Sequence, residues 1–166
     1  MFKSKLVILT TVVVFVFGFI ALDFAIAGEK LKIKSHGVGY TTKMHQIEVG
    51  DVEGHIIIIY EQRSIFANEI SGEKFADRSV GFMNMNPNKP EEMYLTGYGV
   101  HTDKDGDKSN RSFKGKPISK SQWKGVYTVT GGTGKFEGAT GGGNWTSYMI
   151  APQQSYVEVE GEMETP

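Results

Sequence analysis

Histidines are the residues of this sequence best suited to chemistry near neutral pH, and the chain has four of them: His36, His45, His55 and His101. Their spacing puts no two on one strand face at a metal-ligand interval, so we predict no metal site. The chain has no cysteine, which excludes thiolate nucleophiles, disulfide bonds and cysteine-bound metal centres. No nucleophile elbow is present, and no Ser-His-Asp order can be argued.

Carboxylates alternate along Asp103-Lys-Asp105-Gly-Asp107, as they do at the start of a calcium loop. Counted from Asp103, however, position 6 is Lys108 and position 12 is Lys114, where an EF-hand has Gly and Glu. We therefore interpret the segment as an Asp/Gly hairpin turn between two strands, with a weak surface calcium site as the alternative.

The stretch 131–143 has seven glycines in thirteen residues, so a phosphate cradle must be considered. A Walker A loop needs a glycine five residues before its Gly-Lys pair and Ser or Thr after it, but Val129 and Phe136 stand there. The dinucleotide fingerprint fails too, because the glycine after Gly132-x-Gly134 comes one position late, at Gly138. No nucleotide or other cofactor is predicted.

We interpret the same stretch as a structural turn. The glycines of this turn, Gly131, Gly132 and Gly134, are expected to supply positive φ at one position or more, for a tight reversal after a buried strand. Phe136 is expected to pack beneath the turn as an aromatic plug.

Polar and aromatic residues on the expected strands are candidates for lining a ligand cavity. Glu61 and Arg63 share a strand face with Ile57 and Ile59, whereas the other face carries Tyr60 and its alternating neighbours. If the first face looks into a barrel, an acid and a base enter a mostly apolar cavity; if it looks outward, they are solvated. The remaining candidates for ligand binding are Tyr98, His101, Arg111, Tyr127 and Trp145.

Residues 1–27 have the order of a secretory signal: basic Lys3 and Lys5, an apolar run from Leu6 to Leu22, and Ala25-Ile26-Ala27 before Gly28. The alternative is an uncleaved anchor, since the apolar run reaches the short end of a membrane-spanning helix. We expect cleavage, a periplasmic or secreted protein, and contact with a membrane only through the signal segment.

The remaining chain, residues 28–166, is expected to form one domain. Its formal charge is −2, against −1 for the full chain, so no nucleic-acid partner is predicted.

Segments with alternating or β-branched character, separated by turn residues, predict eight or nine strands and little helix. Short strands at this spacing are typical of a closed barrel or a sandwich, and glycines within strands at Gly97, Gly99 and Gly125 favour the barrel. The strand segments are 31–38, 41–49, 55–66, 74–83, 93–101, 110–114, 123–130, 144–150 and 156–163.

The segment from Val129 to Gly141 reads Val-x-Gly-Gly-Thr-Gly-x-Phe-x-x-Ala-x-Gly, between Trp123–Thr130 and Gly143-Asn144-Trp145. It resembles the signature loop of dirigent proteins, allene oxide cyclases and bacterial allene oxide cyclase barrel-like proteins. This resemblance implies an all-β fold, an eight-stranded antiparallel barrel around a cavity, and it leaves a homo-oligomer open because plant members often form trimers. The cysteine in the allene oxide cyclase pocket has no counterpart here.

These observations predict an exported barrel that binds an apolar or phenolic small molecule without a cofactor. One alternative is a cofactor-free isomerase or cyclase that uses Glu61 or His101 for acid–base chemistry. A second is a structural or interaction protein whose barrel is filled by its own side chains. A perturbed acid or histidine in a dry pocket would favour the isomerase, and a filled interior would favour the structural protein.

Overall fold

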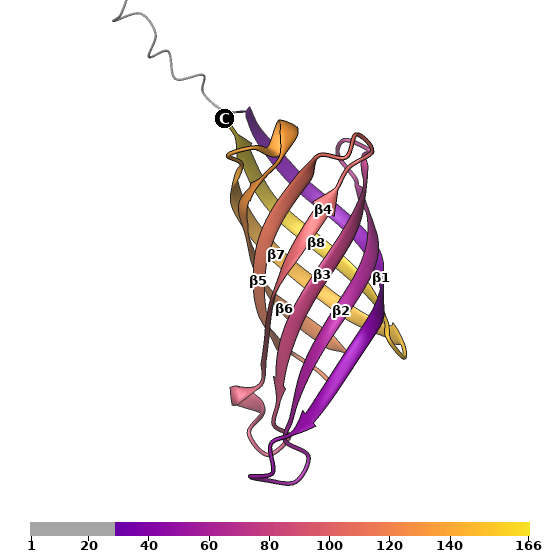
Figure 1. The fold of residues 1–166 in the computed structure, drawn as a ribbon, viewed down its shortest axis with the longest axis vertical. Coiled ribbons are helices and arrows are strands. Elements are labelled where there is room, and N and C mark those ends of the chain that lie inside the picture. The colour runs from indigo at the N-terminus through magenta and orange to yellow at the C-terminus, as the bar shows by residue number, and fades with distance from the viewer. Residues whose placement is uncertain (1–28) are drawn as a thin grey trace, which may run out of the picture.

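The computed structural model describes residues 29–166, which form a closed barrel of eight antiparallel strands (Figure 1). Each strand pairs with the next along the chain, and the last pairs with the first, so the predicted eight-stranded all-β barrel is confirmed. The strands are β1 (Glu29–Glu48), β2 (Ile56–Asn68), β3 (Lys74–Met85), β4 (Tyr94–Thr102), β5 (Lys108–Pro117), β6 (Gln122–Gly132), β7 (Thr140–Ala151) and β8 (Gln154–Thr165).

Two single-turn 3₁₀ helices complete the described part of the chain. η1 (Pro90–Glu92) lies at the lower end of the barrel in Figure 1, and η2 (Gly134–Phe136) lies at its upper end. The predicted signal segment, 1–27, lies outside the described residues. Within residues 29–166, no helix has the length and apolar character needed to cross a bilayer.

The first two predicted strands are one long strand, β1, which explains why eight strands form rather than nine. Its register against β2 shifts between Thr41 and Lys43. A bulge of this kind adds a residue to one strand and changes which side chains point inward beyond it. Thr41 lines the interior before the shift, and Met44 and Gln46 line it afterwards.

Strand glycines make room for aromatic side chains inside the barrel. A Cβ at Gly97 would lie 2.5 Å from Cζ of Phe113, and a Cβ at Gly125 would lie 2.6 Å from Cζ2 of Trp145. The sequence predicts only that these glycines allow their strands to bend. In the structure they also leave room for aromatic rings from neighbouring strands.

The upper end of the barrel is closed by a buried core beneath η2. Phe136 is 5% exposed and Ala139 is 1% exposed, so the aromatic plug is in place. The turn above it has φ of +115° at Gly131 and +57° at Gly134, in the left-handed region that favours glycine. We call this η2 side the closed end.

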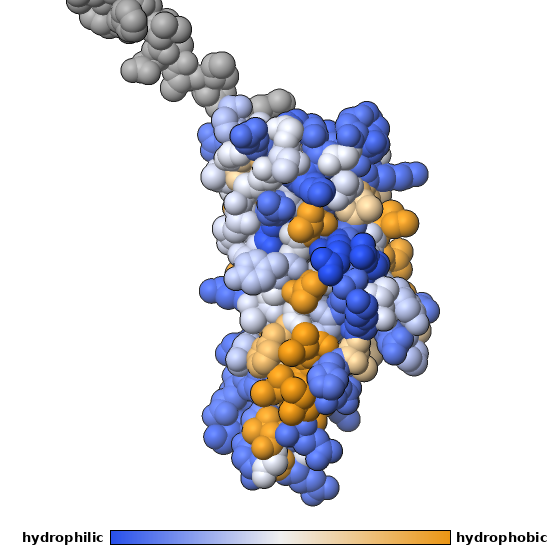
Figure 2. Space-filling view, in the orientation of Figure 1, coloured by the Kyte–Doolittle hydropathy of each residue, from blue (hydrophilic) through white to orange (hydrophobic). Residues whose placement is uncertain are grey.

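The outer wall carries apolar residues as well as charged ones. Figure 2 shows a hydrophobic patch low on the face formed by β1 to β3, where Ile47, Val49 and Ile59 are between 42% and 48% exposed. Ile59 points outward while Ile58 beside it is buried. Hydrophobicity therefore does not distinguish the inner from the outer face of β2.

Candidate functional site

The barrel interior contains a cavity of about 570 Å³ lined by residues from all eight strands. Cavities of 300 to 1,000 Å³ hold drug-sized ligands. The barrel is thus not filled by its own side chains, which removes the main observation that would have favoured a purely structural protein.

The middle of the cavity has aromatic and aliphatic walls. Phe113 and Trp145 pack edge to face, with ring centroids 6.4 Å apart and an interplanar angle of 84°. The indole Nε1–H of Trp145 donates to the carbonyl oxygen of Val126 at 3.1 Å, which fixes the ring's orientation. The other apolar wall residues are Ile58, Tyr60, Phe66, Leu95, Trp123, Tyr127, Val157 and Val159.

The cavity opens towards the end opposite η2, among methionines and polar turn residues. Met44 is 49% exposed and Met149 is 59% exposed, and both line the cavity. Met83 and Met85, both on β3, also line it. Methionine side chains are flexible and polarisable, so this mouth can adapt to ligands of different shape.

A buried acid and a histidine face each other towards the closed end. Asp77 of β3 and His101 of β4 are register partners, and His101 Nε2 lies 3.0 Å from Asp77 Oδ1. The imidazole packs against Phe66 and Phe75, with ring centroids 5.0 and 5.9 Å away. Burial and the nearby positive charge of Arg111 lower the pKa of His101 to about 4, against the opposing effect of Asp77. His101 is therefore a neutral imidazole at pH 7 that donates to the carboxylate.

Arg111 of β5 lines the same region of the cavity. It is the register partner of Gly99, and a Cβ at Gly99 would lie 3.4 Å from both Cγ of Arg111 and Oδ1 of Asp77. The aliphatic part of the Arg111 side chain therefore lies next to Gly99 on the inner face of the barrel. Its guanidinium carbon is 5.6 Å from the ring centroid of Tyr127, within the range of a cation–π contact.

Two polar groups here lack partners. Nε of Arg111 and the hydroxyl of Tyr127 are buried and have no hydrogen-bond partner among the described residues. Burial lowers the pKa of Arg111 and raises that of Tyr127. An orphaned donor is costly in an apolar cavity, so these groups are the chemically distinctive feature of the interior.

Four of the seven predicted cavity residues line the cavity: His101, Arg111, Tyr127 and Trp145. Tyr98 does not, because it lies on the outer face of β4 and is 73% exposed. Asp77 was missed by the sequence reasoning. The available signal was the alternation along β3, which places Asp77 with Ser79, Gly81 and Met83 on one face.

Glu61 and Arg63 also lie outside the barrel, because the even-numbered residues of β2 point inward. Glu61 Oε2 is 2.8 Å from Nη2 of Arg78, and Glu61 Oε1 is 3.1 Å from Nε of Arg63. The hydrogen bond from Arg78 is the main reason why the pKa of Glu61 falls to about 2. We accordingly remove Glu61, Arg63 and Tyr98 from the candidate ligand-binding set.

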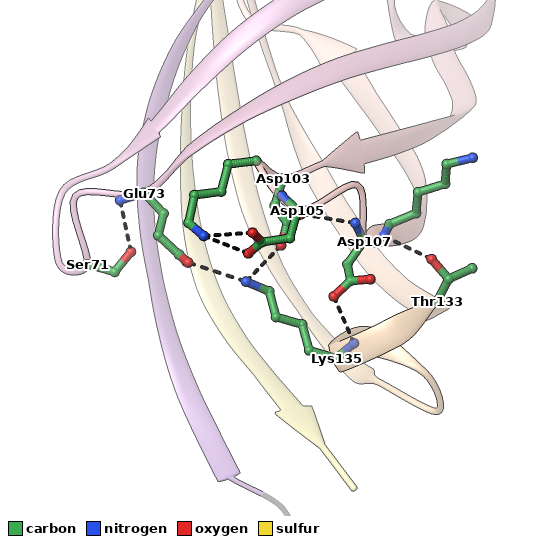
Figure 3. Close-up of polar contacts among 9 residues, drawn as sticks. Ser71, Glu73, Asp103, Asp105, Asp107, Thr133 and Lys135 are labelled. Atoms are coloured by element: carbon green, nitrogen blue, oxygen red, sulfur yellow. Dashed lines mark hydrogen bonds and ion pairs between the residues drawn. The ribbon is translucent and has the colours of Figure 1, made fainter.

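The aspartate-rich loop forms the turn between β4 and β5 at the closed end (Figure 3). Oδ1 of Asp103 accepts the backbone N–H groups of Asp105 and Asp107 at 2.8 and 3.0 Å. Oδ2 of Asp103 lies 2.7 Å from Nζ of Lys135, and the backbone N–H of Lys135 donates to Asp107 Oδ2 at 3.2 Å. The loop is thus a turn whose aspartates, through their contacts with Lys135, hold η2 over the end of the barrel.

The backbone resembles those of solved dirigent proteins. The pterocarpan synthase dirigent protein GePTS1 matches with a TM-score of 0.55 at 12% identity, covering 86% of this chain and 88% of that one. The pterocarpan synthase dirigent protein PsPTS1 matches with a TM-score of 0.53 at 12% identity, covering 84% and 97%. The fold is a dirigent-like β-barrel.

No protein-family model matches the sequence, and the search of curated proteins finds no match. At 12% identity the likeness of this dirigent-like barrel to its neighbours establishes the fold alone. The function of this chain must therefore be inferred from the residues that line its cavity.

Proposed function

We propose that this dirigent-like barrel binds an apolar small molecule, ring-containing or acyl, inside its cavity without a cofactor. The observation that carries the proposal is the 570 Å³ cavity, whose apolar walls end in a buried polar group. Apolar walls supply most of the binding free energy in such sites, and a few fixed polar groups supply orientation. The two solved dirigent proteins described above are named as pterocarpan synthases, which supports small organic molecules as the ligand class.

We propose further that the protein acts outside the cytoplasm, with Gly28 as its mature N-terminus. The support is the order of basic, apolar and small residues in 1–27.

A second candidate is a cofactor-free isomerase or cyclase, and the Asp77–His101 pair is the observation that favours it. A neutral imidazole held by a carboxylate is the arrangement of a general base with its orienting group. The pair faces an apolar cavity, where a substrate proton would be poorly solvated. With Glu61 on the outer wall, His101 is the acid–base residue that this candidate requires.

A ligand screen on residues 28–166 tests the binding proposal. Fatty acids, phenolics and terpenoids are added, and melting temperature is measured, because a ligand at a hundredfold excess over Kd stabilises the folded state by about 2.7 kcal/mol. Ser79→Phe fills the cavity, and Val80→Phe places the same ring on the outer face as a matched control. Binding should be lost only in Ser79→Phe. Equal loss in both variants, or no shift with any compound in the wild type, would refute the proposal.

Measuring the conversion of bound compounds distinguishes an isomerase from a binding protein. Each compound that binds is incubated with wild-type protein and with Asp77→Asn and His101→Gln. Conversion that disappears in both variants, while binding remains, would establish the isomerase; unchanged compound in every sample would leave a binding protein.

A further inference from the structure

We infer that the ligand of this cavity carries a carboxylate, which pairs with Arg111. The inference rests on the proposed function and narrows it, because it names the polar group that an otherwise apolar ligand must present. Among the described residues, Asp77 is the sole acidic lining residue, and the basic ones are His101, Arg111 and Lys120.

Arg111 faces the charge of Asp77 but makes no direct ion pair among residues 29–166. The ion pairs of residues 29–166 engage Arg63 and Arg78 on the outer wall, but none includes Arg111. Asp77 is the sole acidic lining residue among those described, and its Oδ1 contacts His101 at 3.0 Å, whereas no contact joins its carboxylate to the guanidinium. Arg111 is thus a guanidinium that lines the cavity against the face of Tyr127, with no carboxylate paired directly to it among the described residues.

Filling the cavity makes an unpaired guanidinium more costly. A ligand that occupies the interior displaces solvent from Arg111, and a desolvated charge without a partner is strongly unfavourable. A wholly apolar ligand would therefore lose affinity, because its binding would desolvate the guanidinium of Arg111 without supplying a partner. A ligand that brings an anionic acceptor to this position removes the penalty and adds a charge-assisted hydrogen bond.

The chemistry of the guanidinium favours a carboxylate over other anions. Guanidinium presents a planar fork that matches the two oxygens of a carboxylate, and Arg111 lines the cavity as a single guanidinium over the face of Tyr127. A phosphate would bring up to two charges and three acceptor oxygens to a site with a single cation. The position of Arg111 away from the methionine mouth means that the acid group enters first and the apolar body fills the aromatic middle.

Matched probes test this inference in the wild-type protein, where folding is not in question. The compounds are 2-naphthylacetate and 2-naphthylacetamide, which share an apolar body and differ in charge, and affinity is measured by isothermal titration calorimetry. We expect the acid to bind at least tenfold more tightly than the amide. Equal affinities would overturn the inference while leaving the proposed function intact, whereas absence of binding by both compounds and by every compound of the screen would count against the proposed function itself.

Variants identify Arg111 as the source of the preference. Arg111→Gln should reduce the acid-to-amide ratio to about one, and Arg63→Gln on the outer wall should leave it unchanged. Asp77→Asn should increase the acid's affinity, because it removes the negative charge closest to Arg111. If Arg111→Gln does not fold, Arg111→Lys keeps the charge without the fork and should retain part of the preference. A ratio in Arg111→Gln equal to that of the wild type would overturn the assignment.

Discussion

Lowering the pH from 7 to 5 should destabilise the barrel by about 2 kcal/mol through His101 alone. The pKa of this imidazole falls from 6.5 to about 4 on folding, chiefly because of burial and then because of Arg111, with Asp77 opposing both. As the pH falls below 6.5, the unfolded chain binds a proton that the folded chain refuses until about pH 4. Stability that is present above pH 6.5 is therefore lost through this window, and the loss approaches about 3 kcal/mol near pH 4.

Urea denaturation at half-unit steps from pH 7 to pH 5, followed by circular dichroism, measures this slope. His101→Gln should remove most of it, because glutamine cannot take up the proton. His55→Gln is the matched control. The pKa of His55 is raised, mainly by its hydrogen bond with Asn84, so its contribution is present below pH 6.5 and is lost as the pH rises. A slope in His101→Gln equal to that of the wild type would refute the reasoning.

Three further predictions concern the turn, the outer wall and the N-terminus. Gly131→Val or Gly134→Val should cost about 1–3 kcal/mol in urea denaturation, since both positions have positive φ; unchanged stability in both would show that the turn tolerates ordinary residues. Glu61→Gln should leave ligand affinity in calorimetry unchanged, and a changed affinity would mean that the outer wall communicates with the cavity. Intact-mass analysis of exported protein should give Gly28 as the first residue, and a soluble exported chain retaining 1–27 would contradict cleavage.

The sequence was sufficient for the architecture because its signals are local. Turn residues punctuate alternating segments, and the loop from Val129 to Gly141 combines positive-φ glycines with the buried Phe136. The bulge between Thr41 and Lys43 could not be foreseen, because nothing in that stretch marks an extra residue except the pairing that β2 imposes.

The cavity was harder to predict because it depends on which face of each strand turns inward. The run from Ile56 to Ile59 places isoleucine on both faces, so the direction of Glu61 could not be read from hydrophobicity. Asp77 becomes a candidate functional residue only because it pairs with His101 on the neighbouring strand. That juxtaposition follows from register, which pairs residues far apart in the chain.

Methionine methyl groups offer the most direct test of whether a ligand enters the cavity. Met83 and Met85 line it, whereas Met93 does not. Protein labelled with ¹³C at the methionine methyls is titrated with 2-naphthylacetate and, separately, with 2-naphthylacetamide, and nuclear Overhauser effects to the naphthyl protons are recorded. Saturable shifts and Overhauser contacts at Met83 and Met85, but not at Met93, are the predicted result. Contacts confined to Met93, or no saturable shift with either compound, would contradict binding inside the barrel.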